Sequence, residues 1–271
     1  MKNICKFCGK EKKLINAHII PKNFYIGLVD GKYIGINTKT GKYKYWQNGN
    51  YDSNILCGEC DNNILGEFDK ESYRILLGDF SKYEKICIAP NYTIYKITND
   101  KFNYTKLRKF FVSVLWRASV ATSEEWKCIN LGPYEKKALE ILKDIKEHDS
   151  LFKILIYKNK INSNFNQQIS LGKIKYDKYK AYIIQMAGYY IKIIVDSRRL
   201  TSQFRRTYER CFLNPESVQI IETPNVDKWN YAEFQGQMQK LDKIGFVPPK
   251  PKSQKSQNNH TSEKYSKING K

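Results

Sequence analysis

The sequence predicts an α+β protein with an N-terminal zinc-bound, treble-clef-like finger, followed by an α+β domain of antiparallel strands and amphipathic helices. Two Cys-x-x-Cys pairs within the first sixty residues have the spacing of a structural zinc site. The stretch 104–120 carries apolar side chains at helical spacing along one face. Runs of apolar residues between positions 151 and 222 are bounded by turn residues, which is typical of strands.

The two cysteine pairs are Cys5 with Cys8 and Cys57 with Cys60. Four thiolates make a closed tetrahedral zinc site, so Zn²⁺ is predicted as a structural cofactor. The second pair leads into a helix, and the segment between the pairs contains a hairpin, which is the treble-clef arrangement. The alternative is a pair of redox dithiols, but the βαβ context of a thioredoxin-like motif is absent.

Secondary structure follows from periodicity and turn residues. Alternating aromatic runs at 32–36 and 42–46 flank a turn at 37–41 and predict a hairpin. Helices are predicted at 60–77, 104–120, from Pro133 to about 145, and at 227–244. Strands are predicted across 85–97 with a turn at Asn91, and at 151–157, 180–186, 189–195 and 217–222. The expected domains are a finger at 1–78, an α+β domain of unknown role at 79–246, and a disordered basic tail at 247–271.

Composition limits the class of protein. The 271 residues are 41% hydrophobic, enough for a core, but no apolar run is long enough to span a membrane. Seven cysteines and the lack of a secretory signal favour a reducing, cytoplasmic location. The net charge of +20, from 47 Lys and Arg against 27 Asp and Glu, favours a nucleic-acid partner. A biased composition is the alternative explanation for this charge.

His18 lies between the two cysteine pairs in the run Ala17-His18-Ile19-Ile20-Pro21. Because four cysteines already close a zinc site, His18 is available for another role. A free imidazole can take a proton from water near neutral pH and, beside a divalent ion, can serve a hydrolytic site. The alternatives are a packing histidine among isoleucines and a zinc ligand that replaces one cysteine.

The series Cys-x-x-Cys, His-Ile-Ile-Pro and Ile-Leu-Cys-x-x-Cys-Asp resembles the zinc-ribbon branch of the HNH, or ββα-metal, endonucleases over residues 3–75. The resemblance implies a metal-dependent nuclease in which His18 is the general base and Mg²⁺ or Mn²⁺ is the catalytic ion. It places Asp61 at the family's last histidine, as a ligand of that ion. Asp52 or Asn54 falls near the family's middle asparagine; Asn54 is assigned to catalysis, and Asp52 is a second candidate ligand.

Two departures from the family pattern concern this metal site. Ala17 stands where the family usually has an acidic residue or histidine, and Asp61 replaces the final histidine. Asp69 is a further candidate ligand, but on a straight α-helix it stands ~12 Å along the axis from Asp61. The two carboxylates would then need a bend in the helix to bind one ion together.

Basic residues provide candidate nucleic-acid contacts, with DNA favoured over RNA: Lys22, Arg198, Arg199, Arg205 and Arg206. The alternative is an ordinary solvated helical face. The segment 110–119 resembles one that accompanies such fingers in bacterial proteins associated with defence against phage; Trp116 and Arg117 within it are interpreted as packing and capping residues. Two other functions stay open, a non-catalytic zinc module that binds nucleic acid and an interaction subunit of a defence complex.

Overall fold

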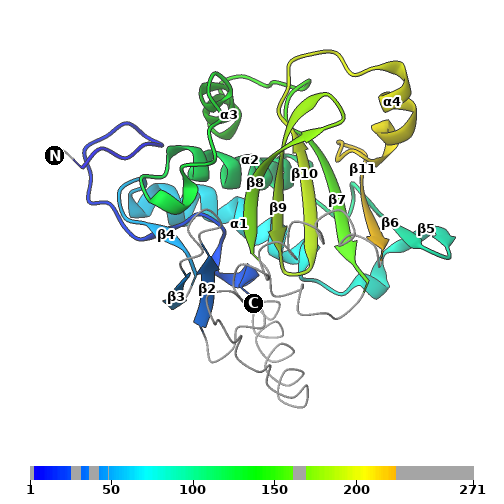
Figure 1. The fold of residues 1–271 in the computed structure, drawn as a ribbon, viewed down its shortest axis with the longest axis horizontal. Coiled ribbons are helices and arrows are strands. Elements are labelled where there is room, and N and C mark those ends of the chain that lie inside the picture. The colour runs from blue at the N-terminus through cyan, green and yellow to red at the C-terminus, as the bar shows by residue number, and fades with distance from the viewer. Residues whose placement is uncertain (1–2, 26–31, 37–42, 48, 161–168, 224–271) are drawn as a thin grey trace.

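The computed structural model describes residues 3–25, 32–36, 43–47, 49–160 and 169–223. Its helices and strands are arranged as a small N-terminal region beside a seven-stranded sheet with helices packed against it (Figure 1). The predicted mixed α+β class with antiparallel sheets is therefore confirmed. The predicted helix 227–244 and the tail 247–271 lie outside the described residues. No described helix has both the length and the apolar character needed to cross a membrane.

The N-terminal region, called the finger below, comprises the described residues up to position 76. Strand β1 (Ala17–His18) pairs antiparallel with β4 (Tyr51–Asp52). Strands β2 (Lys32–Ile36) and β3 (Tyr43–Gln47) form the predicted antiparallel hairpin. The chain then continues through a π-helix, η2 (Glu59–Leu65), into α1 (Gly66–Leu76), so the predicted helix exists but its first part is wound more widely.

The large sheet has the strand order β5-β6-β11-β7-β10-β9-β8. Every neighbouring pair is antiparallel except β11 with β7, which is parallel. The strands are β5 (Glu84–Ala89), β6 (Tyr92–Thr98), β7 (Lys153–Asn159), β8 (Ser170–Tyr176), β9 (Tyr179–Met186), β10 (Tyr189–Ile194) and β11 (Ser217–Thr223). Ala187 and Gly188 join β9 to β10 with positive φ angles of 50° and 79°, as a two-residue hairpin turn requires.

Helix α2 (Tyr104–Val120) is the central helix, and its bounds agree with those predicted from its apolar spacing. It packs against α1 and against α3 (Tyr134–Leu142). Aromatic contacts join it to the finger: the ring centroids of Phe7 and Trp116 are 5.7 Å apart, and those of Phe24 and Phe110 are 5.4 Å apart. One continuous apolar core therefore includes side chains of the finger, α2 and the sheet.

The opposite face of the sheet carries a second apolar cluster, covered by helix α4 (Ser202–Tyr208). Phe204 of α4 packs its ring at 5.5 Å from Tyr176 and 5.3 Å from Tyr179. Neither α4 nor strand β8 was predicted. Helix α3 ends at Leu142, before the expected position 145, and Ile145 is 68% exposed.

Candidate functional site

The sulfur atoms of Cys5, Cys8, Cys57 and Cys60 all lie within 4.8 Å of one another. A tetrahedral Zn²⁺ with Zn–S bonds of about 2.3 Å separates its sulfur ligands by ~3.8 Å, so these four thiols could hold an ion such as zinc. Three of the cysteines are buried and Cys8 is half-buried. Among the described residues, no second group of three His, Cys, Asp or Glu side chains converges in this way.

Backbone contacts bring the two cysteine pairs together. The Lys6 amide donates to the Ile55 carbonyl at 2.8 Å, and the Cys57 amide donates to the Cys5 sulfur at 3.4 Å. Gly9 closes the first pair with φ of +74° and donates its amide to the Cys5 carbonyl. Burial and the neighbouring sulfurs raise the pKa of the Cys60 thiol. A metal ion that binds the four cysteines must therefore displace the thiol protons.

His18 ends the short strand β1. Its partner in the strand pair is Tyr51, and the two rings are 6.1 Å apart in an edge-on arrangement. The side chain is half-buried, whereas Ile19 and Ile20 are fully buried. The imidazole is therefore not enclosed by its isoleucine neighbours, which disfavours the packing interpretation.

Arg117 of helix α2 lies beside His18 and is 1% exposed. Its Nη1 donates to the His18 carbonyl at 3.0 Å, and its Nη2 donates to Asp69 Oδ1 at 2.8 Å and to Ser113 Oγ at 3.0 Å. Desolvation lowers the pKa of Arg117, but the carboxylates of Asp69 and Asp61 more than offset it, and the pKa is raised. Arg117 therefore stays charged inside the protein and joins β1 to α1.

Asp61 and Asp69 interact electrostatically with each other and with His18 and Arg117. Burial raises the pKa of Asp61, and the charges of Arg117 and His18 oppose that rise. Burial also raises the pKa of Asp69, Arg117 opposes this rise, and the Asp61 charge adds to it. The distance expected between Asp61 and Asp69 assumed a straight α-helix, and this was wrong for Asp61. The segment η2 is π-helical, since the amide of Gly66 donates to the Asp61 carbonyl, five residues back.

Asp52 has a structural role that the sequence did not indicate. Its Oδ2 accepts from the Thr122 amide at 2.6 Å and from the Ser123 amide at 3.1 Å, and its Oδ1 accepts from the Asn54 amide at 2.8 Å. The side chain is 3% exposed. These donors hold both carboxylate oxygens against the segment after α2, so we remove Asp52 from the candidate ligands.

The structure also shows the surroundings of Asn54 and Ala17. Asn54 is exposed, and its side-chain amide donates to Thr122 Oγ1 at 3.2 Å, which places it beside the chain after α2. Ala17 is fully buried opposite Asp52 in the strand pair and offers no ligand atom. The hydrogen bonds therefore connect His18 with Arg117 and Asp69, and Asn54 with Thr122.

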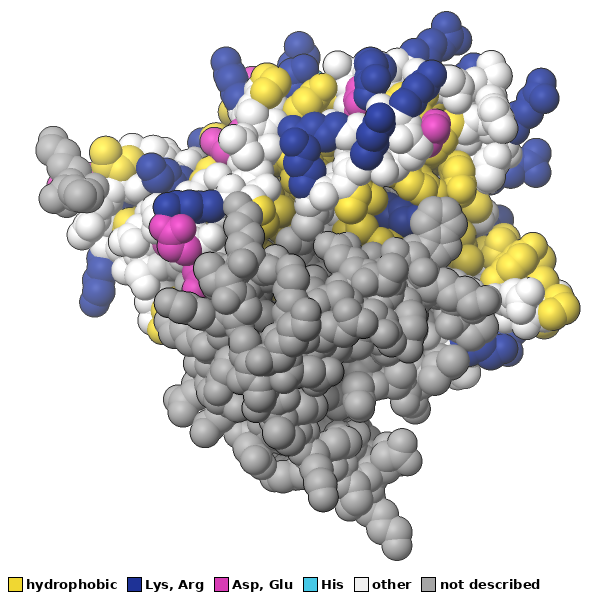
Figure 2. Space-filling view, viewed as in Figure 1, with side chains coloured by type: hydrophobic (Ala, Val, Ile, Leu, Met, Phe, Trp, Pro, Cys, Tyr) yellow, Lys and Arg dark blue, Asp and Glu magenta, His cyan; other side chains and the backbone are white. Residues whose placement is uncertain are grey.

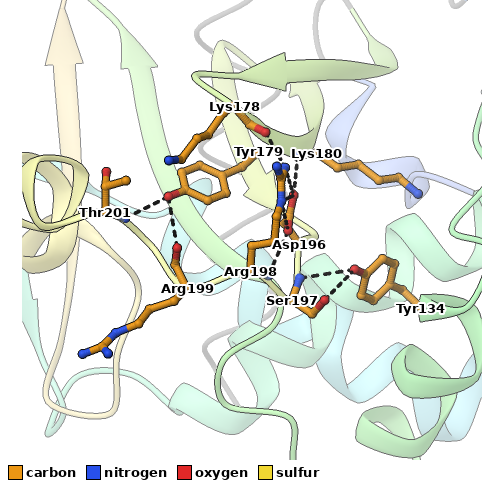
Figure 3. A network of polar contacts seen from close by, with 9 residues as sticks. All are labelled: Tyr134, Lys178, Tyr179, Lys180, Asp196, Ser197, Arg198, Arg199 and Thr201. Carbon is orange, nitrogen blue, oxygen red and sulfur yellow. Dashed lines mark hydrogen bonds and ion pairs between the residues drawn. The ribbon is translucent and has the colours of Figure 1, made fainter.

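The predicted nucleic-acid contacts are dispersed. Lys22 is exposed in a short 3₁₀ helix four residues after His18. Arg198 is held by Asp196, with Nε at 2.9 Å from Oδ1 and Nη2 at 2.6 Å from Oδ2 (Figure 3). Arg199 points its guanidinium away from this network (Figure 3). Arg205 and Arg206 lie on α4, with Arg205 half-buried and Arg206 exposed.

Arg117 was interpreted as a packing and capping residue; it is buried in the packing of α2, and its guanidinium bonds the His18 carbonyl and Asp69, contacts that this interpretation did not include. One signal was present in the sequence, since Arg117 interrupts the apolar end of a helix where Val114, Leu115, Trp116 and Ala118 are all buried. A charge at such a position requires a partner. The identity of that partner depends on how α2 crosses the finger, which no local pattern encodes.

Comparisons of the chain with protein-family models, with curated proteins and with solved structures found no match. A half-buried imidazole, two partly desolvated carboxylates and a buried guanidinium interact with one another, and Asp61 directly follows Cys60 in the chain. Such a set can accept a proton, bind a hard cation through oxygen and stabilise negative charge.

Proposed function

We propose that this protein is a metal-dependent, HNH-type endonuclease, and that it acts in bacterial defence against phage. In this proposal Zn²⁺ binds the four cysteines in a treble-clef finger and has a structural role. The observation that carries the proposal is the position of His18 at a strand end, within electrostatic reach of Asp61 and Asp69 on the adjoining helices. The family resemblance expects a residue of the helix to bind the ion opposite the base, and Asp61 is the candidate for that ligand, whereas Ala17 supplies none.

In the proposed mechanism His18 accepts a proton from the attacking water. A divalent ion, bound by Asp61 and coordinated otherwise by water, would stabilise the phosphate and the leaving oxygen. Mg²⁺ commonly binds through one or two carboxylates and keeps several waters, so a closed ligand set is not required. Arg117 holds the His18 backbone and the Asp69 carboxylate, which fixes the spacing between strand and helix.

A specific observation favours the second candidate, a non-catalytic zinc module that binds nucleic acid. Asp69, one of the two carboxylates near His18, is already paired with Arg117 at 2.8 Å. A cation at that position reduces the attraction of the site for a divalent ion. In this second candidate the side chains of His18, Asp61, Asp69 and Arg117 would only stabilise the joint between finger and α2.

The deciding experiment measures cleavage of plasmid DNA and of structured RNA with Mg²⁺ or Mn²⁺. We expect His18→Ala to lower the rate by about 10²- to 10⁴-fold, the usual contribution of a general base, with unchanged circular dichroism. His148→Ala is the matched control, because His148 bonds Glu140 in α3 and is not part of the site.

Wild-type protein that binds nucleic acid without cleaving it would select the non-catalytic module. Association with an acidic protein that is insensitive to salt would instead select the interaction subunit.

A further inference from the structure

Three lysines lie on one face of the β8–β9 hairpin, far along the chain from the finger. Lys173 and Lys175 alternate along β8, and Lys180 lies on β9 directly opposite Lys175. Lys173 and Lys175 are exposed, whereas Lys180 is half-buried. We call these three side chains the lysine face. Like charges directly opposite each other in a sheet destabilise it, so this arrangement costs folding free energy.

No carboxylate within the described part of the chain forms an ion pair with these lysines. The ammonium of Lys180 donates to the Asn130 carbonyl at 3.2 Å and lies 5.5 Å from the ring centre of Tyr134. Lys137 lies 5.4 Å from the same ring and extends the positive region onto α3. Desolvation lowers the pKa of Lys180, and the charge of Lys173 lowers it further.

Asp196 is the acidic residue in the network of Figure 3, which also contains Lys180, and its carboxylate already accepts hydrogen bonds. It accepts from the backbone amide, Nε and Nη2 of Arg198, and from the Lys180 amide at 3.0 Å. Arg198 also donates to the Lys178 carbonyl, which fixes its guanidinium over the turn of the hairpin. The Asp196 charge is therefore balanced by Arg198, and the lysine face keeps its positive charge.

The lysine face belongs to a larger positive surface. Figure 2 shows Lys and Arg side chains gathered on the upper part of the face in view, where Figure 1 places α3, α4 and the upper ends of β8 to β10. Lysine on an edge strand also prevents pairing with another chain, which would explain Lys173 and Lys175 on β8. It does not explain Lys180, because β9 lies between β8 and β10 inside the sheet.

We propose that the lysine face binds the phosphate backbone of nucleic acid as a second contact, separate from the site around His18. Phosphates would relieve the repulsion between Lys175 and Lys180 and release condensed counterions. The inference rests on the proposed function only in taking nucleic acid as the partner. Because the contacts are made by ammonium groups on a strand surface, they recognise charge and spacing and not base sequence.

The test measures binding of the full chain to a fluorescent 20-base-pair DNA duplex and to the RNA duplex of the same sequence, without added Mg²⁺. Replacing Lys173, Lys175 and Lys180 together by Gln should weaken binding at least ~10-fold and reduce the slope of log K against log salt by about 2 to 3. The matched control replaces Lys82, Lys85 and Lys101, which are equally charged and exposed at other places, and should change binding much less.

Thermal unfolding checks that both triple variants are folded. Equal loss of binding in the two triple variants would overturn the proposal, as would stronger binding to polyglutamate competitor than to either duplex. A preference for one duplex would identify the source of the phosphates. If the lysine-face variant loses binding while the wild type shows no cleavage, this proposal holds and the nuclease is rejected. If cleavage depends on His18 but the lysine-face variant binds as tightly as wild type, the nuclease holds and this proposal is rejected.

Discussion

Arg117 and Lys192 are both cations inside the molecule, but they are stabilised in different ways. Arg117, between the finger and α2, is surrounded by oxygen: the Asp69 carboxylate, the His18 carbonyl and the Ser113 hydroxyl. Lys192, on β10 of the sheet, is 7% exposed and lies over tyrosine rings. Its ammonium is 4.3, 5.0 and 5.6 Å from the ring centres of Tyr176, Tyr157 and Tyr190.

The two environments have opposite consequences for charge. Carboxylates raise the pKa of Arg117, whereas burial lowers the pKa of Lys192 to about 8. Besides its apolar contacts with α2, the finger is joined to the rest of the protein by polar groups that must remain ionised. The sheet is held by apolar packing and tolerates a cation that is close to losing its proton. Replacing charged residues or the four cysteines should therefore lower the stability of the finger far more than that of the sheet.

The largest expected effect is that of metal removal on the finger. A structural zinc site contributes on the order of 10 kcal/mol, so a chelator should expose the amides of β1, β4 and η2 to hydrogen exchange. The amides of β7, β9 and β10 should stay protected, because they belong to the apolar sheet. Cys57→Ser should reproduce this pattern, and Cys128→Ser, at an exposed thiol, should not. Exchange that rises equally in both regions would contradict the distinction between them.

The second effect is that of Arg117→Met, which leaves the Asp69 carboxylate buried without its partner. Breaking a buried ion pair from one side costs about 3 to 5 kcal/mol, measured as the free energy of unfolding in urea. The double variant with Asp69→Asn should recover part of this loss. Arg206→Met, on the exposed side of α4, should stay within about 0.5 kcal/mol of wild type. An Arg117→Met protein as stable as wild type would show that the pair has no role in holding the finger.

The sequence predicted those features that depend on local pattern. Helix α2 was predicted with its bounds because its apolar residues repeat at helical spacing, and the cysteine group followed from the spacing within each pair. Helix α4 was missed because it is short and has few apolar residues. Strand β8 was missed because two of its seven residues are lysines and Gly172 interrupts it.

The candidate site was only partly predictable for a different reason. His18 and Asp61 were identified because each lies next to a recognisable motif. Arg117 lies 99 residues from His18 in the chain, and its role appears only when α2 is packed across β1 and α1. Asp52 was assigned to metal binding from the family resemblance, whereas its partners, Thr122 and Ser123, lie 70 and 71 residues along the chain. Contacts of this range are decided by tertiary packing and not by local spacing.

The smallest expected effect, Lys192→Met, sharpens the contrast because it depends on pH. The pKa of Lys192 is about 8 in the fold against 10.5 ordinarily, so the unfolded chain binds this proton more tightly. Burial of the charged form therefore destabilises the wild type fully below pH 8, and stability is regained as pH rises from 8 to about 10.5. Methionine removes this cost but also the attraction to the tyrosine rings, so we expect a net gain of ~1 kcal/mol at pH 7 that disappears by pH 10. Urea unfolding of both proteins from pH 7 to 10 measures it, with exposed Lys178→Met as the control. A constant difference across this range would show that Lys192 keeps its proton throughout, as Arg117 does.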